Sequence, residues 1–444
     1  MFKINNLVNS HALLLMNWGN DYYVPMLYSS PQEELLACRN GAWLGNFLNC
    51  SPVYELSGPD VVKLMNYVSV NRDYSTLKVG GSRHTIMCNE KGQMLADGVM
   101  MRVDENRYLT YWLAPVLAYY VETLGYDVQG RWVTDEFFIQ IDGPRSLEIM
   151  EKVSGKDLHS LKFAKHTEIE IAGVKTTIHR LGMSGCLAYE MHGDMNKVGE
   201  VYEAIAQAGE EYGLKRLGMM NYCRNHTQGG YPNQYIHFYY PFLLNDEKMK
   251  QYVIEHCGWN TQFCQYNFHG SAADDIENGF VNPYDVKWDY LINWDHDFIG
   301  KKALQEMAKA PARTVVTLEW NAEDIGKAFA SQFTGTPVMP WDDISNIADG
   351  ALLDFFVISK VMNGNQMIGV ASGRERDFYH GNMISLAFIN REYANVGDEY
   401  TVMWGSTPLS AQPIRVKVAP FPYYNEEMRN ETFDVEKIPH PDRK

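Results

Sequence analysis

The stretch EIEIAGVKTTIHRLGMSGCLAYEMHG, residues 168–193, contains the strand, turn and glycine-bend signals from which the fold of the chain can be inferred. Two runs of alternating apolar and polar residues meet at Ala172-Gly173, and this arrangement predicts a tight hairpin. A bend containing Gly182 and Gly185 follows, and alternation along the next strand places Glu190 on the face opposite its apolar neighbours. A solvated hairpin glutamate and a carboxylate at a ligand-binding bend both fit this pattern.

The composition describes an ordinary globular protein of more than one domain. A chain of 444 residues exceeds the size at which one core keeps growing, so two or three domains are expected. A net charge of -16 without a compensating basic run argues against nucleic acid and anionic membranes as partners. The longest nearly apolar run, 111–121, is too short for a span of roughly 20 residues, and we expect a cytoplasmic protein.

The cysteines and histidines give no sign of a metal site or a disulfide framework. The 7 cysteines are scattered without a CxxC pair, so we expect them to be reduced and buried. The 13 histidines include no HExxH motif. We therefore predict no protein-bound metal.

An internal repeat organises the first half of the chain. LSGPDVVKLMNYV at 56–68 parallels IDGPRSLEIMEKV at 141–153, with Gly-Pro pairs and apolar helix faces in matching positions. Each copy is followed by a hairpin-like segment and a further helix, expected at 115–124 and 196–212. The repeat predicts an α+β fold with two halves, each a sheet covered by helices, although two similar Gly-Pro helix starts can also arise by chance.

Other segments differ from this pattern. The aromatic loop at 18–28 contains Tyr22 and Tyr23, and it either lines a pocket or seals a core. The segment 221–242 is rich in Gly, Pro, Asn and aromatic residues, which predicts a long irregular connection. A helix is expected at 301–309. Six short β runs after residue 313 predict a barrel or sandwich, and the charged tail 425–444 is expected to be loosely ordered.

Two stretches, HDFIGKKAL at 296–304 and IGVASGRERDFYHGNMISLAFINREYANVGDEYTV at 368–402, resemble the glycine-cleavage T-protein superfamily of folate-dependent one-carbon transferases. Within it, IAGVKTTIHRLGMSG at 171–185 is most similar to tetrahydrofolate-dependent aryl O-demethylases acting on vanillate, syringate and 3-O-methylgallate. The resemblance implies two interleaved α+β domains around a central folate site and a C-terminal β-barrel. The implied boundaries are 1–52 with 135–215, 53–134 with 216–309, 310–425 for the barrel and 426–444 for the tail.

The resemblance also implies roles for particular residues. Asp97, in KGQMLADGVMM at 91–101, matches the acid that faces the reduced pterin, and Glu190 matches the glutamate that pairs with the pterin ring. Arg180 matches a basic residue before the glycine bend, and it is expected to help bind the folate. Tyr240, or its neighbour Tyr239, matches a tyrosine that protonates the leaving phenolate.

Departures from the family pattern imply the substrate. The Arg-rich helix of T-proteins is replaced by RLGMMNYCR at 216–224, which disfavours glycine cleavage. Phe47, Cys50 and Leu113 stand where benzoate-type demethylases bind a carboxylate, so the resemblance implies a neutral methoxyaromatic donor and tetrahydrofolate as acceptor. Tyr22, Tyr23 and Tyr239 are further candidates for the substrate pocket. Two alternatives remain, namely transfer from a small methylated amine or sulfonium compound, and a folate-binding protein without activity.

Overall fold

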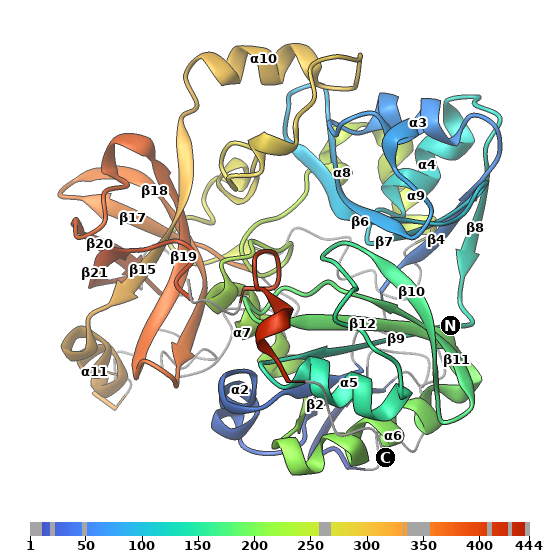
Figure 1. Ribbon diagram of the computed structural model, residues 1–444. Coiled ribbons are helices and arrows are strands. Elements are labelled where there is room, and N and C mark those ends of the chain that lie inside the picture. Colours follow the sequence, from blue (N-terminus) through green and yellow to red (C-terminus); the bar gives the residue numbers. More distant parts are fainter. Residues whose placement is uncertain are drawn as a thin grey trace.

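The computed structural model describes residues 11–17, 23–46, 51–256, 268–331, 333–334, 356–405, 411–424 and 429–439. Two sheets with their helices lie one above the other, and a barrel lies to their left (Figure 1). Among the described residues, no helix combines the length and apolar character that crossing a membrane requires. The described cysteines Cys38, Cys88, Cys186 and Cys223 are buried, as predicted, and are not joined to one another by disulfides.

The first sheet has six strands and contains the stretch 168–193. All pairs are antiparallel except β13 with β3, and the order is β10 (His166–Ile171), β11 (Val174–His179), β12 (Ala188–Asp194), β9 (Glu136–Asp142), β3 (Trp43–Gly45) and β13 (Lys215–Leu217). Leu187, Tyr189 and Met191 pack in one core with α5 (Ser146–Ser154) and α6 (Val198–Gly209). The predicted alternation is confirmed, because Glu190 faces away from this core and lines a cavity.

The second sheet repeats the first in its strand order. Its five strands are β5 (Gly81–Cys88), β6 (Met94–Asp104), β7 (Arg107–Tyr111), β4 (Val53–Ser57) and β8 (Gln129–Val133). The order β5-β6-β7-β4 corresponds to β10-β11-β12-β9 in the first sheet. The core of this half includes residues of α3 (Val61–Val68), α4 (Val116–Thr123), α8 (Phe242–Asn245) and α9 (Glu247–His256). The predicted duplication and α+β class are confirmed.

The Gly-Pro pairs have the same structural reason in both halves. Gly58 and Gly143 have φ values of +125° and +134°, a region that side chains with a Cβ rarely adopt. A Cβ at either position would lie 2.5 Å from a backbone oxygen, that of Asp127 or Gly41. Glycine is therefore required where each strand turns toward its helix.

The C-terminal part of the chain, from residue 313, forms the predicted barrel. It closes in the order β15 (Arg313–Trp320), β19 (Asn382–Asn390), β18 (Gln366–Asp377), β17 (Ser359–Asn363), β20 (Glu399–Trp404) and β21 (Gln412–Ala419). The helix at 301–309 is confirmed as α10. The remaining elements are β1 (Leu14–Asn17), β2 (Tyr23–Leu27), α2 (Pro31–Asn40), α7 (Met219–Gly229), β14 (Phe268–His269), α10 (Lys301–Lys309), α11 (Ala322–Ser331) and β16 (Phe356–Val357). The implied domain boundaries stay a prediction.

Two predictions of irregular structure are wrong in part, since residues 230–241 are irregular as expected and only residues 429–439 of the tail are described. The segment expected to be an irregular connection begins with α7, which ends where Gly230 adopts a left-handed φ of 66°. Its residues 221–229 are all buried between β2 and the barrel strands β18 and β19, and this burial outweighs their poor helix propensity. The tail is also packed over 429–439, since Val435 and Ile438 join the core of the first sheet.

Candidate active site

A cavity of about 960 Å³ lies between the two sheets. Asp97 and Gly98 of β6, Phe138 of β9 and Glu190 of β12 line it, and the segment after α7 adds more of the wall. Small-molecule sites typically occupy ~300–1,000 Å³, so this volume lies at the upper end of the range for such sites. The repeat therefore brings Asp97 and Glu190, one from each half, to one cavity.

Asp97 is the centre of a hydrogen-bond network. One carboxylate oxygen accepts a hydrogen bond from the Tyr240 hydroxyl, and the other lies 2.9 Å from His84 Nε2. The same His84 nitrogen lies 3.1 Å from the Tyr231 hydroxyl. The Trp288 ring packs against both His84 and Tyr231, with centroids at 4.6 and 5.1 Å, so the aromatic walls hold this network in place.

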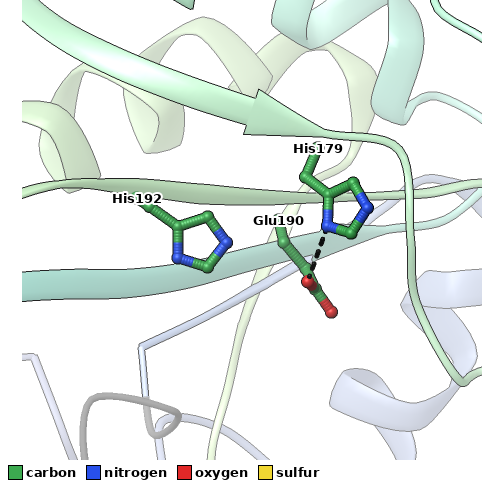
Figure 2. A group of neighbouring side chains, drawn as sticks. All are labelled: His179, Glu190 and His192. Carbon is green, nitrogen blue, oxygen red and sulfur yellow. Dashed lines mark ion pairs between the residues drawn. The ribbon is translucent and has the colours of Figure 1, made fainter. Parts of the chain in front are cut away.

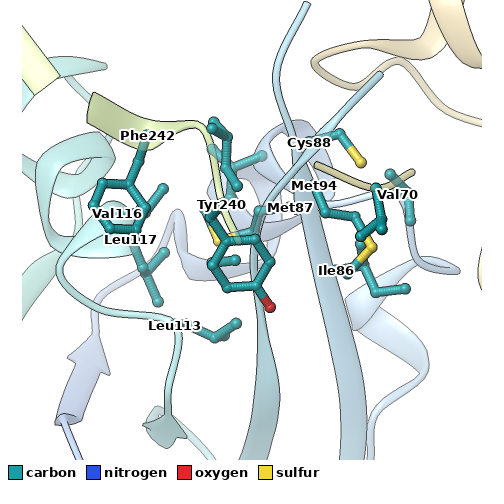
Figure 3. Packing of buried hydrophobic residues seen from close by; sticks show 14 of the residues in the cluster. Val70, Ile86, Met87, Cys88, Met94, Leu113, Val116, Leu117, Tyr240 and Phe242 are labelled. Atoms are coloured by element: carbon teal, nitrogen blue, oxygen red, sulfur yellow. The ribbon is translucent and has the colours of Figure 1, made fainter. Parts of the chain in front are cut away.

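The structure distinguishes between the two adjacent tyrosines. The Tyr240 ring lies among buried apolar side chains that include Leu113, Val116 and Phe242 (Figure 3). Its hydroxyl contacts Asp97. Burial, followed by the charge of Asp97, raises the pKa of Tyr240 well above its usual value. Tyr239 instead packs in an aromatic cluster and is not among the described residues that line the cavity.

Glu190 lies against two histidines of the first sheet (Figure 2). Its carboxylate is 3.4 Å from His179 Nδ1, and His192 lies on the same strand face two residues further along β12. Burial lowers the pKa of His179, so this ring is neutral near pH 7. His179 Nε2 lies 2.7 Å from Ser82 Oγ on β5, a contact that joins the two sheets beside the cavity.

This group also has the chemistry of a metal site. The donor atoms of His179, Glu190 and His192 all lie within 4.8 Å of one another. Two imidazoles and a carboxylate suit a transition metal, whereas a buried carboxylate on a cavity wall equally suits the N–H groups of a pterin. The predicted absence of a metal stays a prediction.

Gly182 provides a close approach at the rim of the cavity. A Cβ at this position would lie 2.2 Å from the Cβ of Ala188 and 3.1 Å from a carboxylate oxygen of Asp142. Any side chain would displace β12 beside Glu190, so the glycine keeps this wall flat.

Arg180 contacts the C-terminal segment of the chain. It is buried and is not among the described residues that line the cavity. Its guanidinium donates to Asn430 Oδ1 at 3.1 Å and to the backbone oxygens of Asn430 and Phe433, both at 3.0 Å. These contacts fasten the C-terminal segment to the first sheet, and the predicted role in folate binding remains a prediction.

Only one of the residues predicted for the substrate pocket is found in the described cavity lining. Leu113 is fully buried and lines the cavity, whereas Tyr23 lies on β2 with 41% of its surface exposed and is absent from the described lining. Tyr22, Phe47 and Cys50 lie outside the described residues.

Two arginines, Arg72 and Arg83, are among the described residues that line the cavity. The Arg83 guanidinium already binds the backbone oxygens of Arg72 and Asp73 and the Thr76 hydroxyl, and it covers the Tyr74 ring at 4.7 Å. Alternation along β5 places it on the face opposite His84. The Arg83 guanidinium is therefore already bound to groups of the protein itself.

Sequence reasoning missed His84, Tyr231 and Trp288. His84 could be found by pairing the hairpin strands β5 and β6, because their register brings it diagonally opposite Asp97. Tyr231 and Trp288 reach the site from distant loops, and no sequence period marks them.

Comparison with known proteins identifies the family. The sequence matches the GCVT N-terminal domain over residues 12–232, and the sesamin methylene transferase of Sinomonas sp. (strain No.22) is 38% identical over 430 residues, 94% of each chain. This chain belongs to the GCVT family. The syringate O-demethylase of Sphingobium sp. (strain NBRC 103272 / SYK-6) is 25% identical over 424 residues, 90% of each chain. This GCVT-family chain is a folate-dependent one-carbon transferase, and the family resemblance inferred from its motifs is confirmed.

A solved structure has the same fold as the GCVT-family chain. Aminomethyltransferase T of the glycine cleavage system from Bartonella henselae superposes with a TM-score of 0.68 over 98% of this chain and 99% of that chain. Its sequence identity is 15%, so the likeness establishes the T-protein fold and leaves the chemistry to the site.

Proposed function

We propose that this protein transfers a one-carbon unit from a neutral aryl ether to tetrahydrofolate. The hydrogen bond between Tyr240 and Asp97 at an apolar cavity wall carries the proposal, because a phenolic hydroxyl beside a carboxylate could supply a proton to a departing aryl oxygen. The relatives named as a sesamin methylene transferase and a syringate O-demethylase support it. Both names describe removal of a one-carbon unit.

Glu190 and Asp97 would hold the folate. Glu190 is 5% exposed, and its carboxylate can accept hydrogen bonds from the N–H groups of the pterin ring. Asp97 approaches from the opposite sheet and would orient the nucleophilic nitrogen. Gly182 allows the flat ring system to lie close to β12.

The Asp97–Tyr240 contact would couple the two proton transfers of the reaction. The pterin nitrogen forms a bond to carbon and loses a proton, while the aryl oxygen breaks its bond to carbon and gains one. Asp97 would accept the first proton and Tyr240 would supply the second. Protonation of Asp97 removes the negative charge that helps raise the pKa of Tyr240, so the tyrosine becomes a stronger acid as the leaving group departs.

The cavity favours a donor without a carboxylate. Leu113 forms part of its wall, and the guanidinium of Arg83 is occupied by backbone oxygens and the Thr76 hydroxyl. Arg72, the other arginine among the described lining residues, is exposed, so a carboxylate beside it would stay in contact with water rather than be buried against a cation. Burying a carboxylate without a cation costs several kcal/mol, whereas an uncharged ring gains about 25 cal/mol for each Å² of apolar surface that it buries.

Competition kinetics with matched donors test the proposal. The enzyme and tetrahydrofolate are incubated with guaiacol or vanillate, and with a methylated amine and a sulfonium compound as further arms, while the folate product is measured. We expect guaiacol to show the higher kcat/KM of the aromatic pair. A higher value for vanillate would refute the neutral donor, turnover of the amine or sulfonium compound alone would establish that alternative, and folate binding without turnover would indicate a non-catalytic protein.

A further inference from the structure

Tyr231 lines the cavity but has no role in the reaction proposed above. Its hydroxyl lies 3.1 Å from His84 Nε2, the same nitrogen that lies 2.9 Å from Asp97. Burial raises the pKa of Tyr231 well above its usual value, so its hydroxyl is protonated near pH 7. The ring packs against Trp288 and His84, which fixes the direction of the hydroxyl.

The shared nitrogen determines where the Tyr231 proton points. One ring nitrogen offers either one hydrogen or one lone pair, and a carboxylate is a stronger acceptor than a phenol. His84 Nε2–H therefore donates to Asp97. Within the described part of the chain, no other group lies within hydrogen-bond distance of the Tyr231 hydroxyl, so its hydrogen is available to a ligand in the cavity.

The cavity thus presents two phenolic donors, Tyr240 and Tyr231, on either side of the Asp97–His84 pair. A methoxyarene has one leaving oxygen and needs one donor, whereas a carbon held between two aryl oxygens must release both. On the basis of the proposed function, we propose that Tyr231 is a second proton donor and that the preferred substrates are neutral arenes with a methylenedioxy group.

The proposed reaction balances without an oxidant or reductant. The first pterin nitrogen attacks the methylene carbon, one C–O bond breaks, and Tyr240 protonates the departing oxygen. The second folate nitrogen then forms its bond to the same carbon, the second C–O bond breaks, and Tyr231 protonates the second oxygen. The two folate N–H protons restore the donors, and the products are a catechol and 5,10-methylenetetrahydrofolate.

Paired substrates test the assignment. The wild type, Tyr231→Phe and Tyr240→Phe are compared on 1,2-methylenedioxybenzene and on 1,2-dimethoxybenzene, with methylene- and methyl-tetrahydrofolate measured separately. Tyr240→Phe should lower kcat on both donors. Tyr231→Phe should lower kcat on the methylenedioxy donor by about 10²-fold or more, with little change in KM, and should affect methyl transfer at least tenfold less.

Three outcomes would overturn the assignment. The first is an equal loss of kcat on the two donors in Tyr231→Phe, which indicates a packing role. The second is no loss of kcat on either donor in this variant. The third is a wild type that uses only the dimethoxy compound. In the last case, the transfer to folate proposed above still stands. A wild type that uses neither donor while binding tetrahydrofolate would instead refute the proposed function. Calorimetric binding of tetrahydrofolate and the melting temperature of each variant confirm that it is folded.

Discussion

At the scale of single residues, the chemistry depends on how one carboxylate is shared. Asp97 accepts from Tyr240 on one oxygen and lies beside His84 on the other, and its charge helps to raise the pKa of Tyr240. Glu190 stands on the opposite sheet and is separate from this network. Folate binding and proton transfer can therefore be tested by different substitutions.

Glu190→Gln should weaken tetrahydrofolate binding more than tenfold. The amide keeps the shape of the side chain but removes the charge, and a hydrogen bond to a charged group contributes ~1.5–3 kcal/mol. Tenfold in Kd corresponds to about 1.4 kcal/mol. Calorimetric titration measures this change, and an unchanged Kd in a folded variant would remove Glu190 from the folate site.

Tyr240→Phe should lower kcat by about 10²–10⁴-fold, the usual contribution of a positioned general acid, while KM changes little. Tyr239→Phe is the matched control, because this ring packs in the aromatic cluster with Phe268 and Phe356. The measurement is steady-state turnover on guaiacol. The assignment of the proton donor is incorrect if the Tyr239 variant loses turnover and the Tyr240 variant keeps it.

At the scale of elements, burial gives α7 and the C-terminal segment an order that their sequences do not indicate. The helix α7 consists largely of polar residues, yet it is enclosed by β2 and the barrel. The segment 429–439 is held by Arg180 and by two apolar side chains. Both elements depend on partners that are distant in sequence, and local patterns therefore mispredict them.

Arg180→Gln should lower the free energy of unfolding by about 2–4 kcal/mol. The substitution removes donors from the backbone oxygens of Asn430 and Phe433, and each unsatisfied buried group costs ~1–3 kcal/mol. Urea denaturation measures the loss. Because the side chain binds the C-terminal segment, we expect the tetrahydrofolate Kd to change less than threefold, and a loss of affinity like that of Glu190→Gln would instead support the predicted contact with folate.

The buried His226 of α7 should make stability depend on pH. Burial lowers its pKa to about 3, whereas an unfolded histidine has a pKa of ~6.5. As the pH falls below ~6.5, the histidine binds a proton in the unfolded state but not in the folded state. The free energy of unfolding therefore decreases by about 1.4 kcal/mol per pH unit. Relative to His226→Gln, the wild type should lose about 2 kcal/mol between pH 7.5 and 5, measured by urea denaturation at each pH. A constant difference between the two proteins would contradict the buried neutral histidine.

At the scale of the whole molecule, the duplication places the site where the two halves meet. The repeat of Gly58-Pro59 and Gly143-Pro144 was visible in the sequence because each glycine meets a local backbone requirement, and it predicted the two matching sheets. Alternation also predicted the face of Glu190. The partners of Asp97 could not be predicted in this way, because His84 requires a strand register and Tyr231 comes from a loop positioned by tertiary packing.

Transfer of labelled carbon tests the central claim most directly. The wild type is incubated with tetrahydrofolate and guaiacol carrying ¹³C in its methoxy group, and the label is followed by NMR. The account predicts that the label appears on the folate in a one-to-one ratio with released catechol. Release of catechol with the label in free methanol or formaldehyde, or no release of catechol from any neutral aryl ether, would contradict it.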